Sequence, residues 1–228
     1  MKIITEGGIS SKNSPIYTID SFKLANKNNK VDGIKIDIYL TKDNKIILLN
    51  EEVMKKTGID VQFICEHTFS YLENLNIGTK VKRNKIISID ELLKTYKHKY
   101  IVVNIKENQY RNDILVKTLF KYVNNNTNIE WFLMSNSSKI VNLLYSQETN
   151  AKIGKIVNNY KDTTYSFDFY STNIENINLF PDKKDSIIVI NDVNTQNDLI
   201  QLFKYKNNFN NLFAITNNYG LITNKYIK

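Results

Sequence analysis

The sequence is poor in cysteine, proline, glycine and histidine. Its 228 residues include one Cys, two Pro, seven Gly and two His. The single cysteine, Cys65, cannot form a disulfide within its own chain, and this excludes a disulfide-framed secreted fold. Because Gly and Pro are scarce, we expect no long structureless linker and predict one domain over residues 1–228.

Long apolar runs are also missing. No run approaches the roughly 18 residues that a membrane-spanning helix needs. Charged side chains occur at once, at Lys2 and Glu6, which is too early for a secretory signal. We therefore expect a protein that is not transmembrane and that is located in the cytoplasm.

Positive charge is abundant, with a formal net charge of +8. The lysines are nevertheless dispersed among asparagines and isoleucines. The densest clusters, Lys55-Lys56 and Lys80-Val81-Lys82-Arg83, are short, and no recognition motif accompanies them. We expect a basic, solvated surface and no nucleic-acid partner.

Short apolar runs rich in β-branched residues alternate with segments of helical period. This alternation favours an α/β fold with a parallel sheet and outer helices, and eight such units close into a barrel. An open, doubly wound sheet is also compatible with the pattern. The predicted strands are Lys2–Thr5, Gly33–Tyr39, Lys45–Leu49, Tyr100–Ile105, Trp131–Ser135, Lys152–Val157, Ser166–Tyr170, Ser186–Ile190 and Leu212–Thr216.

Local signals predict where several helices and one turn begin. Ser88-Ile89-Asp90-Glu91 has the pattern of a capping box, in which the Ser88 hydroxyl and the Glu91 carboxylate each accept a backbone N–H. Asn112, Ser137 and Thr195 are candidate starts of further helices. Thr41–Lys45, between two strand-like runs, predicts a tight turn.

Several segments resemble the glycerophosphodiester phosphodiesterase family. Asp32–Ile38 and Leu40–Asn44 are similar to the family's DGIELDV and LTKDG, and Ile86–Leu93 stands where the family has IPTLEELL. Asn104–Lys106 falls at its EIK. The resemblance runs through the chain in order, from Ile3 to Thr216. It implies a TIM (β/α)8 barrel of the phospholipase-C-like phosphodiesterase type, with a small insertion at about residues 51–85.

The resemblance also implies a chemistry. In this family three carboxylates hold calcium or magnesium beside a phosphodiester, two histidines act as acid and base, and glycerol phosphate is released. Hard oxygen ligands suit such a cation. The metal offsets charge on the phosphoryl oxygens, and imidazole moves protons near neutral pH.

The chain departs from that pattern at most of the functional positions. The family's first and second histidines are replaced by Glu6 and Asn50, and two of its three metal carboxylates by Lys35 and Asn104. The candidate site residues are Glu6, Gly7, Gly8, Lys35, Asp37, Asn50, Asn104 and Lys106. Among the residues that would do the chemistry, only Asp37 and Lys106 keep the family's residue. We therefore expect no metal cofactor; calcium or magnesium would be needed only by an active enzyme.

Strand alternation predicts that Lys35 and Asp37 share a face, as do Asn104 and Lys106. With Glu6 they would form a cluster that is neutral without metal. Three interpretations are open: a buried ion-pair network, an anion site built from Lys35, Lys106 and the amides of Gly7 and Gly8, or residual catalysis.

The resulting hypothesis is a degenerate, catalytically inactive member of the family. It would bind a glycerophosphoryl or other phosphate ligand, or a protein partner such as an active homologue. The alternative is an active phosphodiesterase that cleaves glycerophosphodiesters to glycerol phosphate and an alcohol.

The remaining reactive side chains are not expected to rescue a catalytic site. His98 precedes a predicted strand and would lie at the opposite end of the barrel. His67 and Cys65 fall in the insertion, where structural roles are commoner. Glu107 is one residue out of phase with Lys106 and should point away from the site.

Overall fold

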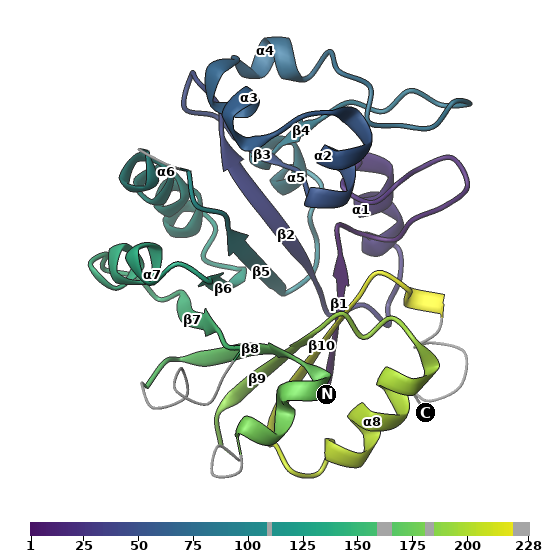
Figure 1. Cartoon of the computed structure of the whole chain (residues 1–228), viewed down its shortest axis with the longest axis vertical. Helices are drawn as coiled ribbons and strands as arrows, with labels where there is room; N and C mark the ends of the chain where they lie inside the picture. Colours follow the sequence, from purple (N-terminus) through teal and green to yellow (C-terminus); the bar gives the residue numbers. More distant parts are fainter. Residues whose placement is uncertain (109–110, 159–165, 181–184, 221–228) are drawn as a thin grey trace.

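The computed structural model describes residues 1–108, 111–158, 166–180 and 185–220, and its centre is a closed parallel sheet (Figure 1). Consecutive strands pair in parallel around the sheet, and β10 returns to β1. The predicted TIM barrel is thus confirmed. Its strands are β1 (Lys2–Glu6), β2 (Gly33–Leu40), β5 (Tyr100–Ile105), β6 (Glu130–Ser135), β7 (Lys152–Ile156), β8 (Phe169–Asn173), β9 (Ile187–Asn191) and β10 (Asn211–Thr216).

An antiparallel extension continues the sheet beyond the end of β2. Strand β3 (Ile46–Leu48) folds back on β2 through the turn predicted at Thr41–Lys45, and β4 (Ile87–Ser88) pairs with β3. Between β3 and β4 lie three short helices, α2 (Glu51–Thr57), α3 (Val61–Glu66) and α4 (Phe69–Leu72). They pack on an apolar cluster of their own and occupy the top of Figure 1.

Helices cover the outer face of the barrel. They are α1 (Ile19–Asn26), α5 (Ile89–Leu93), α6 (Asn112–Asn125), α7 (Ser138–Tyr145), the 3-10 helix η2 (Ile174–Leu179) and α8 (Gln196–Tyr205). The capping box at Ser88 is confirmed, and Thr195 caps α8 in the same way with Asp198. Ser137 and Asn112 mark the starts of α7 and α6, but neither start has a side-chain cap. None of the described helices is long and apolar enough to cross a membrane.

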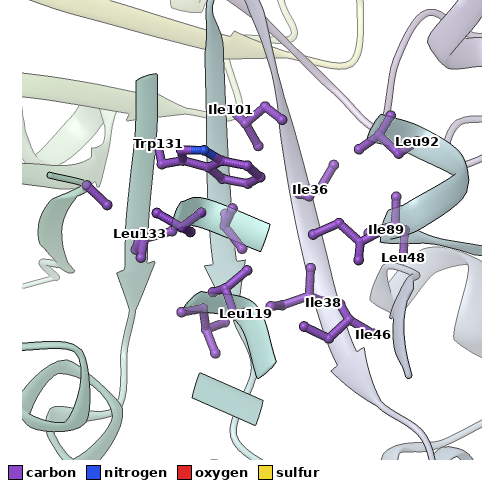
Figure 2. Packing of buried hydrophobic residues seen from close by; sticks show 14 of the residues in the cluster. Ile36, Ile38, Ile46, Leu48, Ile89, Leu92, Ile101, Leu119, Trp131 and Leu133 are labelled. Carbon is purple, nitrogen blue, oxygen red and sulfur yellow. The ribbon is translucent and has the colours of Figure 1, made fainter. Parts of the chain in front are cut away.

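Strand alternation separates the two faces of the barrel wall. Ile36 and Ile38 of β2 point outward into the core beneath the helices, where they lie near Ile89 and Leu92 of α5 (Figure 2). Successive strand residues point to opposite faces. Lys35, which lies between Ile34 and Ile36, therefore points into the barrel, together with Asp37.

Aromatic rings fill the barrel interior toward the N-terminal ends of the strands. Phe132 lies 5.3 Å from Phe169 and 5.0 Å from Phe213 between ring centroids. A side chain at Gly154 would meet the Phe169 ring at 2.6 Å, so glycine leaves room for that ring. Because this part is packed, polar chemistry inside the barrel is confined to its other end, which we call the barrel mouth.

One strand prediction was wrong by three residues. The run Ser166–Tyr170 was expected to form the strand that the structure places at Phe169–Asn173. The Asp168 carboxylate accepts the backbone N–H of Ile153, and strand pairing starts only after it. The two-residue strand β4 was not predicted, since two residues carry no periodicity.

Candidate functional site

The barrel mouth brings together five of the predicted site residues. Strand register places Glu6 beside Lys35, and Asp37 beside Asn104. Lys106 comes directly after β5. These residues occupy the C-terminal ends of adjacent parallel strands, which is where barrels of this kind place their sites.

Lys35 is at the centre of this group. Its Nζ lies 2.7 Å from Glu6 Oε1 and 3.4 Å from Asp37 Oδ1. All three side chains are buried or nearly so, with Asp37 only 5% exposed. The ammonium group therefore stands between two carboxylates in a poorly solvated place.

The burial of this group shifts two pKa values. Burial by itself lowers the pKa of Lys35, but the charges of Asp37 and Glu6 outweigh it and raise the pKa above the ordinary lysine value. Burial also raises the pKa of Glu6, although Lys35 opposes this shift. Two carboxylates share one ammonium, so Lys35 stays protonated while Glu6 is easier to protonate than an ordinary glutamate.

A second cation extends the network outward. Lys106 Nζ lies 3.7 Å from Asp37 Oδ2 and 2.9 Å from Glu51 Oε1, while Asn104 Nδ2 donates to Asp37 Oδ1 at 3.1 Å. Hydrogen bonding and the charge of Lys106 lower the pKa of Glu51. We name Glu6, Lys35, Asp37, Glu51, Asn104 and Lys106 the mouth cluster. Its formal charge is −1, from three carboxylates and two ammonium groups.

Three other candidate residues have roles in the backbone structure around the mouth. Asn50 Oδ1 accepts the Val53 amide at 2.9 Å and so caps α2. The Gly7 amide donates to the Lys35 carbonyl at 2.9 Å, so the expectation that it is open to a ligand was wrong. Gly8 has φ +90°, and a Cβ there would lie 2.5 Å from the Ser21 backbone. Close packing against α1 accounts for glycine at that position.

Tyr17 is a site residue that the sequence did not reveal. It is fully buried, and its hydroxyl accepts the Asp37 amide at 3.0 Å. Its ring lies over Gly7, where an added Cβ would approach it to 2.4 Å. Burial, together with the charges of Asp37 and Glu6, raises the pKa of Tyr17 well above its ordinary value. Tyr17 is therefore a neutral phenol, and its hydroxyl holds the β2 backbone in place beneath the cluster.

The far wall of the mouth was also missed. Asp192, at the end of β9, has a charge that acts on both Glu6 and Lys35. Asn191 donates through Nδ2 to Ser171 Oγ at 2.8 Å, and its buried Oδ1 has no hydrogen-bond partner among the described residues. The Asn191-Asp192 pair carries no motif, so only the structure could show its place.

The mouth cluster does not fit a divalent metal. The Lys35 ammonium occupies the space between Glu6 and Asp37, and it would repel a dication there. Asn104 directs its amide nitrogen, not its oxygen, at Asp37. Within the described residues, no three His, Cys, Asp or Glu side chains are grouped so as to hold a metal ion.

The two histidines lie elsewhere. His98 precedes β5 and donates through Nε2 to the Ala25 carbonyl at 2.8 Å, which places it at the N-terminal end of the barrel. His67 is stacked between Phe63 and Tyr71, with ring centroids 4.1 and 4.4 Å away. Neither imidazole belongs to the mouth cluster, so the cluster has no histidine acid or base.

Two neighbouring side chains also match the sequence expectations. The Cys65 thiol donates to Asn108 Oδ1 at 2.8 Å, and burial raises its pKa, so it is a poor nucleophile. Glu107 is exposed to solvent, and it lines the same cavity as Lys106.

A cavity of about 590 Å³ opens beside the mouth cluster. Apolar side chains of the insertion line it, together with two lysines and the carboxylates of Glu51, Asp60 and Glu107. Lys106 is 26% exposed and its partner Glu51 is 64% exposed, so this outer ion pair is far more accessible than Lys35. The lining includes Tyr39, Glu51, Met54, Lys55, Ile59 and Lys106.

Comparison with known proteins places this architecture in a family. The model of the glycerophosphoryl diester phosphodiesterase family matches residues 10–208. The chain belongs to that family. A curated glycerophosphodiester phosphodiesterase from Caldanaerobacter subterraneus subsp. tengcongensis is 30% identical over 100 residues. The match covers 42% of this chain and 41% of that relative, which is well under two thirds of its length.

Solved structures of family members share the fold. A phosphodiesterase from Oleispira antarctica, in complex with its product sn-glycerol-3-phosphate, matches with a TM-score of 0.75 at 12% identity, covering 94% of this chain and 92% of that one. The glycerophosphodiester phosphodiesterase of Thermotoga maritima matches with a TM-score of 0.72 at 18% identity, over 95% and 94%. Membership of the glycerophosphoryl diester phosphodiesterase family confirms the resemblance found in the sequence.

Proposed function

We propose that this member of the glycerophosphoryl diester phosphodiesterase family does not hydrolyse phosphodiesters and instead binds a phosphorylated headgroup at the barrel mouth. The main support is the position of Lys35 Nζ, 2.7 Å from Glu6 and 3.4 Å from Asp37. A fixed ammonium stands between the two carboxylates there, and the proposal includes no metal cofactor.

The proton-transfer groups support the same conclusion. Glu6 stands at one family histidine position and is held by Lys35, and Asn50 stands at the other and caps α2. A positioned acid or base typically contributes about 10²–10⁴-fold to a rate. Losing both, together with the metal ligands, is expected to leave hydrolysis below detection.

Binding is assigned to Lys106 rather than to Lys35. Lys35 is shared by the buried Glu6 and Asp37, whereas Lys106 makes only a 3.7 Å contact with Asp37 and lines the cavity together with Lys55. Glu51 is mostly exposed and could release Lys106 to an anion at small cost. The proposed ligand class is supported by the structure from Oleispira antarctica, whose complex holds sn-glycerol-3-phosphate. A protein partner or an active homologue stays a prediction.

Two measurements test this function. Glycerophosphocholine should not be hydrolysed by the full chain, with or without millimolar calcium or magnesium. Calorimetric titration with glycerol phosphate should give binding that Lys106→Ala abolishes and that Lys99→Ala, a change in a surface ion pair with Glu130, preserves. Turnover that disappears in Asp37→Ala would establish the phosphodiesterase alternative. Absence of binding heat would reject the headgroup site.

A further inference from the structure

A hairpin formed by residues 76–85 projects from the insertion, between α4 and β4. Asn76 and Lys85 form an antiparallel bridge at its base, and the Ile77 amide donates to the Asn84 carbonyl at 2.9 Å. At its tip, Thr79 Oγ1 accepts the amides of Val81 and Lys82. In Figure 1 this hairpin is the blue-teal loop that extends to the right from the top of the molecule. Its tip is therefore an ordered projection.

The tip exposes an apolar side chain that the fold does not use. Val81 is 82% exposed, more than any other large hydrophobic residue among those described. It belongs to none of the apolar clusters that the described residues form. Packing inside the protein therefore gives no reason for an aliphatic side chain at this position.

Cations flank Val81 along the hairpin. Lys82 pairs with Asp20, and Arg83 donates to the Asn74 carbonyl, which leaves its charge unbalanced. Among the described residues, no carboxylate forms an ion pair with Lys80. The tip therefore has three cations, of which one is paired with a carboxylate.

We propose that the tip of the 76–85 hairpin is a docking site for an anionic lipid bilayer. Cations near such a surface are attracted by its negative potential, and an aliphatic side chain gains by entering the boundary of the acyl chains. The hairpin belongs to the insertion, and its base contacts the loop that follows the mouth end of β1. Docking would therefore bring the lipid to the mouth side of the barrel. This inference goes beyond the proposed function and does not depend on what the mouth binds.

A nucleic acid is the competing partner for such a cationic tip, and the composition of the tip disfavours it. Single-stranded binding surfaces combine cations with aromatic side chains on which bases stack. Residues 79–83 contain no aromatic side chain. An exposed valine adds nothing to phosphate contacts, whereas it adds apolar contact with a bilayer.

Vesicle flotation of the full chain tests the proposal. The protein should float with phosphatidylcholine vesicles that contain about 30 mol% phosphatidylglycerol, and should stay behind with phosphatidylcholine alone. Val81→Asp should abolish flotation. The double variant Lys80→Glu/Arg83→Glu should lower the vesicle binding constant at least about 25-fold, because each lost cation lowers it about fivefold.

A matched control separates the hairpin from net charge in general. Lys117→Glu/Lys121→Glu makes the same change of charge on the exposed side of α6, and it should retain flotation. Equal losses in both double variants, or full flotation of Val81→Asp, would overturn the proposal. So would binding of a single-stranded oligonucleotide, lost in the hairpin variants, together with no flotation. Unchanged melting temperatures would show that each variant is folded.

Discussion

At the scale of single residues, the barrel mouth is governed by where a few buried charges find partners. Lys35 contacts Glu6 and Asp37 at the place where the family resemblance implies a metal site, and the Tyr17 hydroxyl accepts the backbone amide of Asp37. A buried charge is tolerated only when it is paired. Changing one member therefore affects the stability of the whole barrel.

Lys35→Met is expected to destabilise the protein by about 3–5 kcal/mol, because it leaves the buried Glu6 without its counter-charge and leaves Asp37 with only the 3.7 Å contact to Lys106. Urea denaturation at neutral pH measures this loss. The control is Lys99→Met, which breaks an exposed pair with Glu130 and should cost no more than about 1 kcal/mol. A similar small loss for both variants would mean that Lys35 is not part of a buried network.

Tyr17→Phe is expected to lower stability at pH 7 by about 1–3 kcal/mol, because the buried Asp37 amide loses its acceptor. Above pH 10 this difference should shrink. The folded-state pKa of Tyr17 is raised, so the stability contributed by its bound proton is complete below about pH 10 and is lost as pH rises.

The wild type should therefore lose about 1.4 kcal/mol relative to Tyr17→Phe for each pH unit above 10. Urea denaturation of both proteins between pH 7 and pH 11 measures the difference. A constant gap over this range would show that the Tyr17 phenol is not held neutral.

The sequence could predict part of this site. Glu6, Lys35, Asp37, Asn104 and Lys106 were identified by their resemblance to the family's motifs, and strand alternation then predicted which of these side chains share a face. Glu51 and Asp192 were missed because each follows a strand end, and their directions depend on loop conformations that have no period. Tyr17 was missed because its backbone lies in the left-handed region, with φ +64°, and the sequence does not predict that conformation for a tyrosine.

At the scale of elements, helix α2 connects the insertion to the mouth. Asn50 caps its first turn, and the next residue, Glu51, reaches Lys106. Gly58, with φ +70°, ends the helix in the left-handed conformation. A residue at a lost histidine position has thus become part of the helix that closes one side of the mouth.

Asn50→Ala is expected to cost about 1 kcal/mol, the usual effect of removing an N-cap, whereas Asn50→Asp should be close to neutral because aspartate caps equally well. Thermal or urea unfolding of the two variants gives the comparison. Equal effects of both changes would show that capping is not what Asn50 contributes.

Element boundaries show where sequence patterns succeed. The long apolar strands β2 and β5 were predicted nearly to the residue, since eight and six consecutive buried positions leave little choice. The prediction for β8 was wrong by three residues because Asp168 binds the neighbouring strand through its carboxylate. Hydrogen bonds of that kind have no signature in hydrophobic periodicity.

At the scale of the whole molecule, the fold is that of the family while the charge balance of the mouth is different. The aromatic rings that fill the barrel interior lie toward the N-terminal ends of the strands, away from the polar residues of the mouth. Fold therefore does not carry the activity, which has to be argued from the site.

For the whole molecule, we predict that divalent metal ions do not change thermal stability. Millimolar calcium or magnesium should leave the melting temperature unchanged, because the mouth cluster does not fit a dication. A ligand at 100 times its dissociation constant would add about 2.7 kcal/mol of stability and raise the melting temperature visibly. Differential scanning calorimetry with each metal and with EDTA decides this. A rise that Asp37→Ala abolishes would reveal a metal site.

The position of Lys35 between two carboxylates also constrains the mutational routes open to the chain. Lys35→Glu alone would crowd three negative charges into one buried space, and Glu6→His alone would remove a partner on which Lys35 depends. Each single step toward the family's residues is therefore unfavourable until the other has been taken. This is sign epistasis, and it means that single substitutions toward the family's residues are selected against even when the double substitution is tolerated.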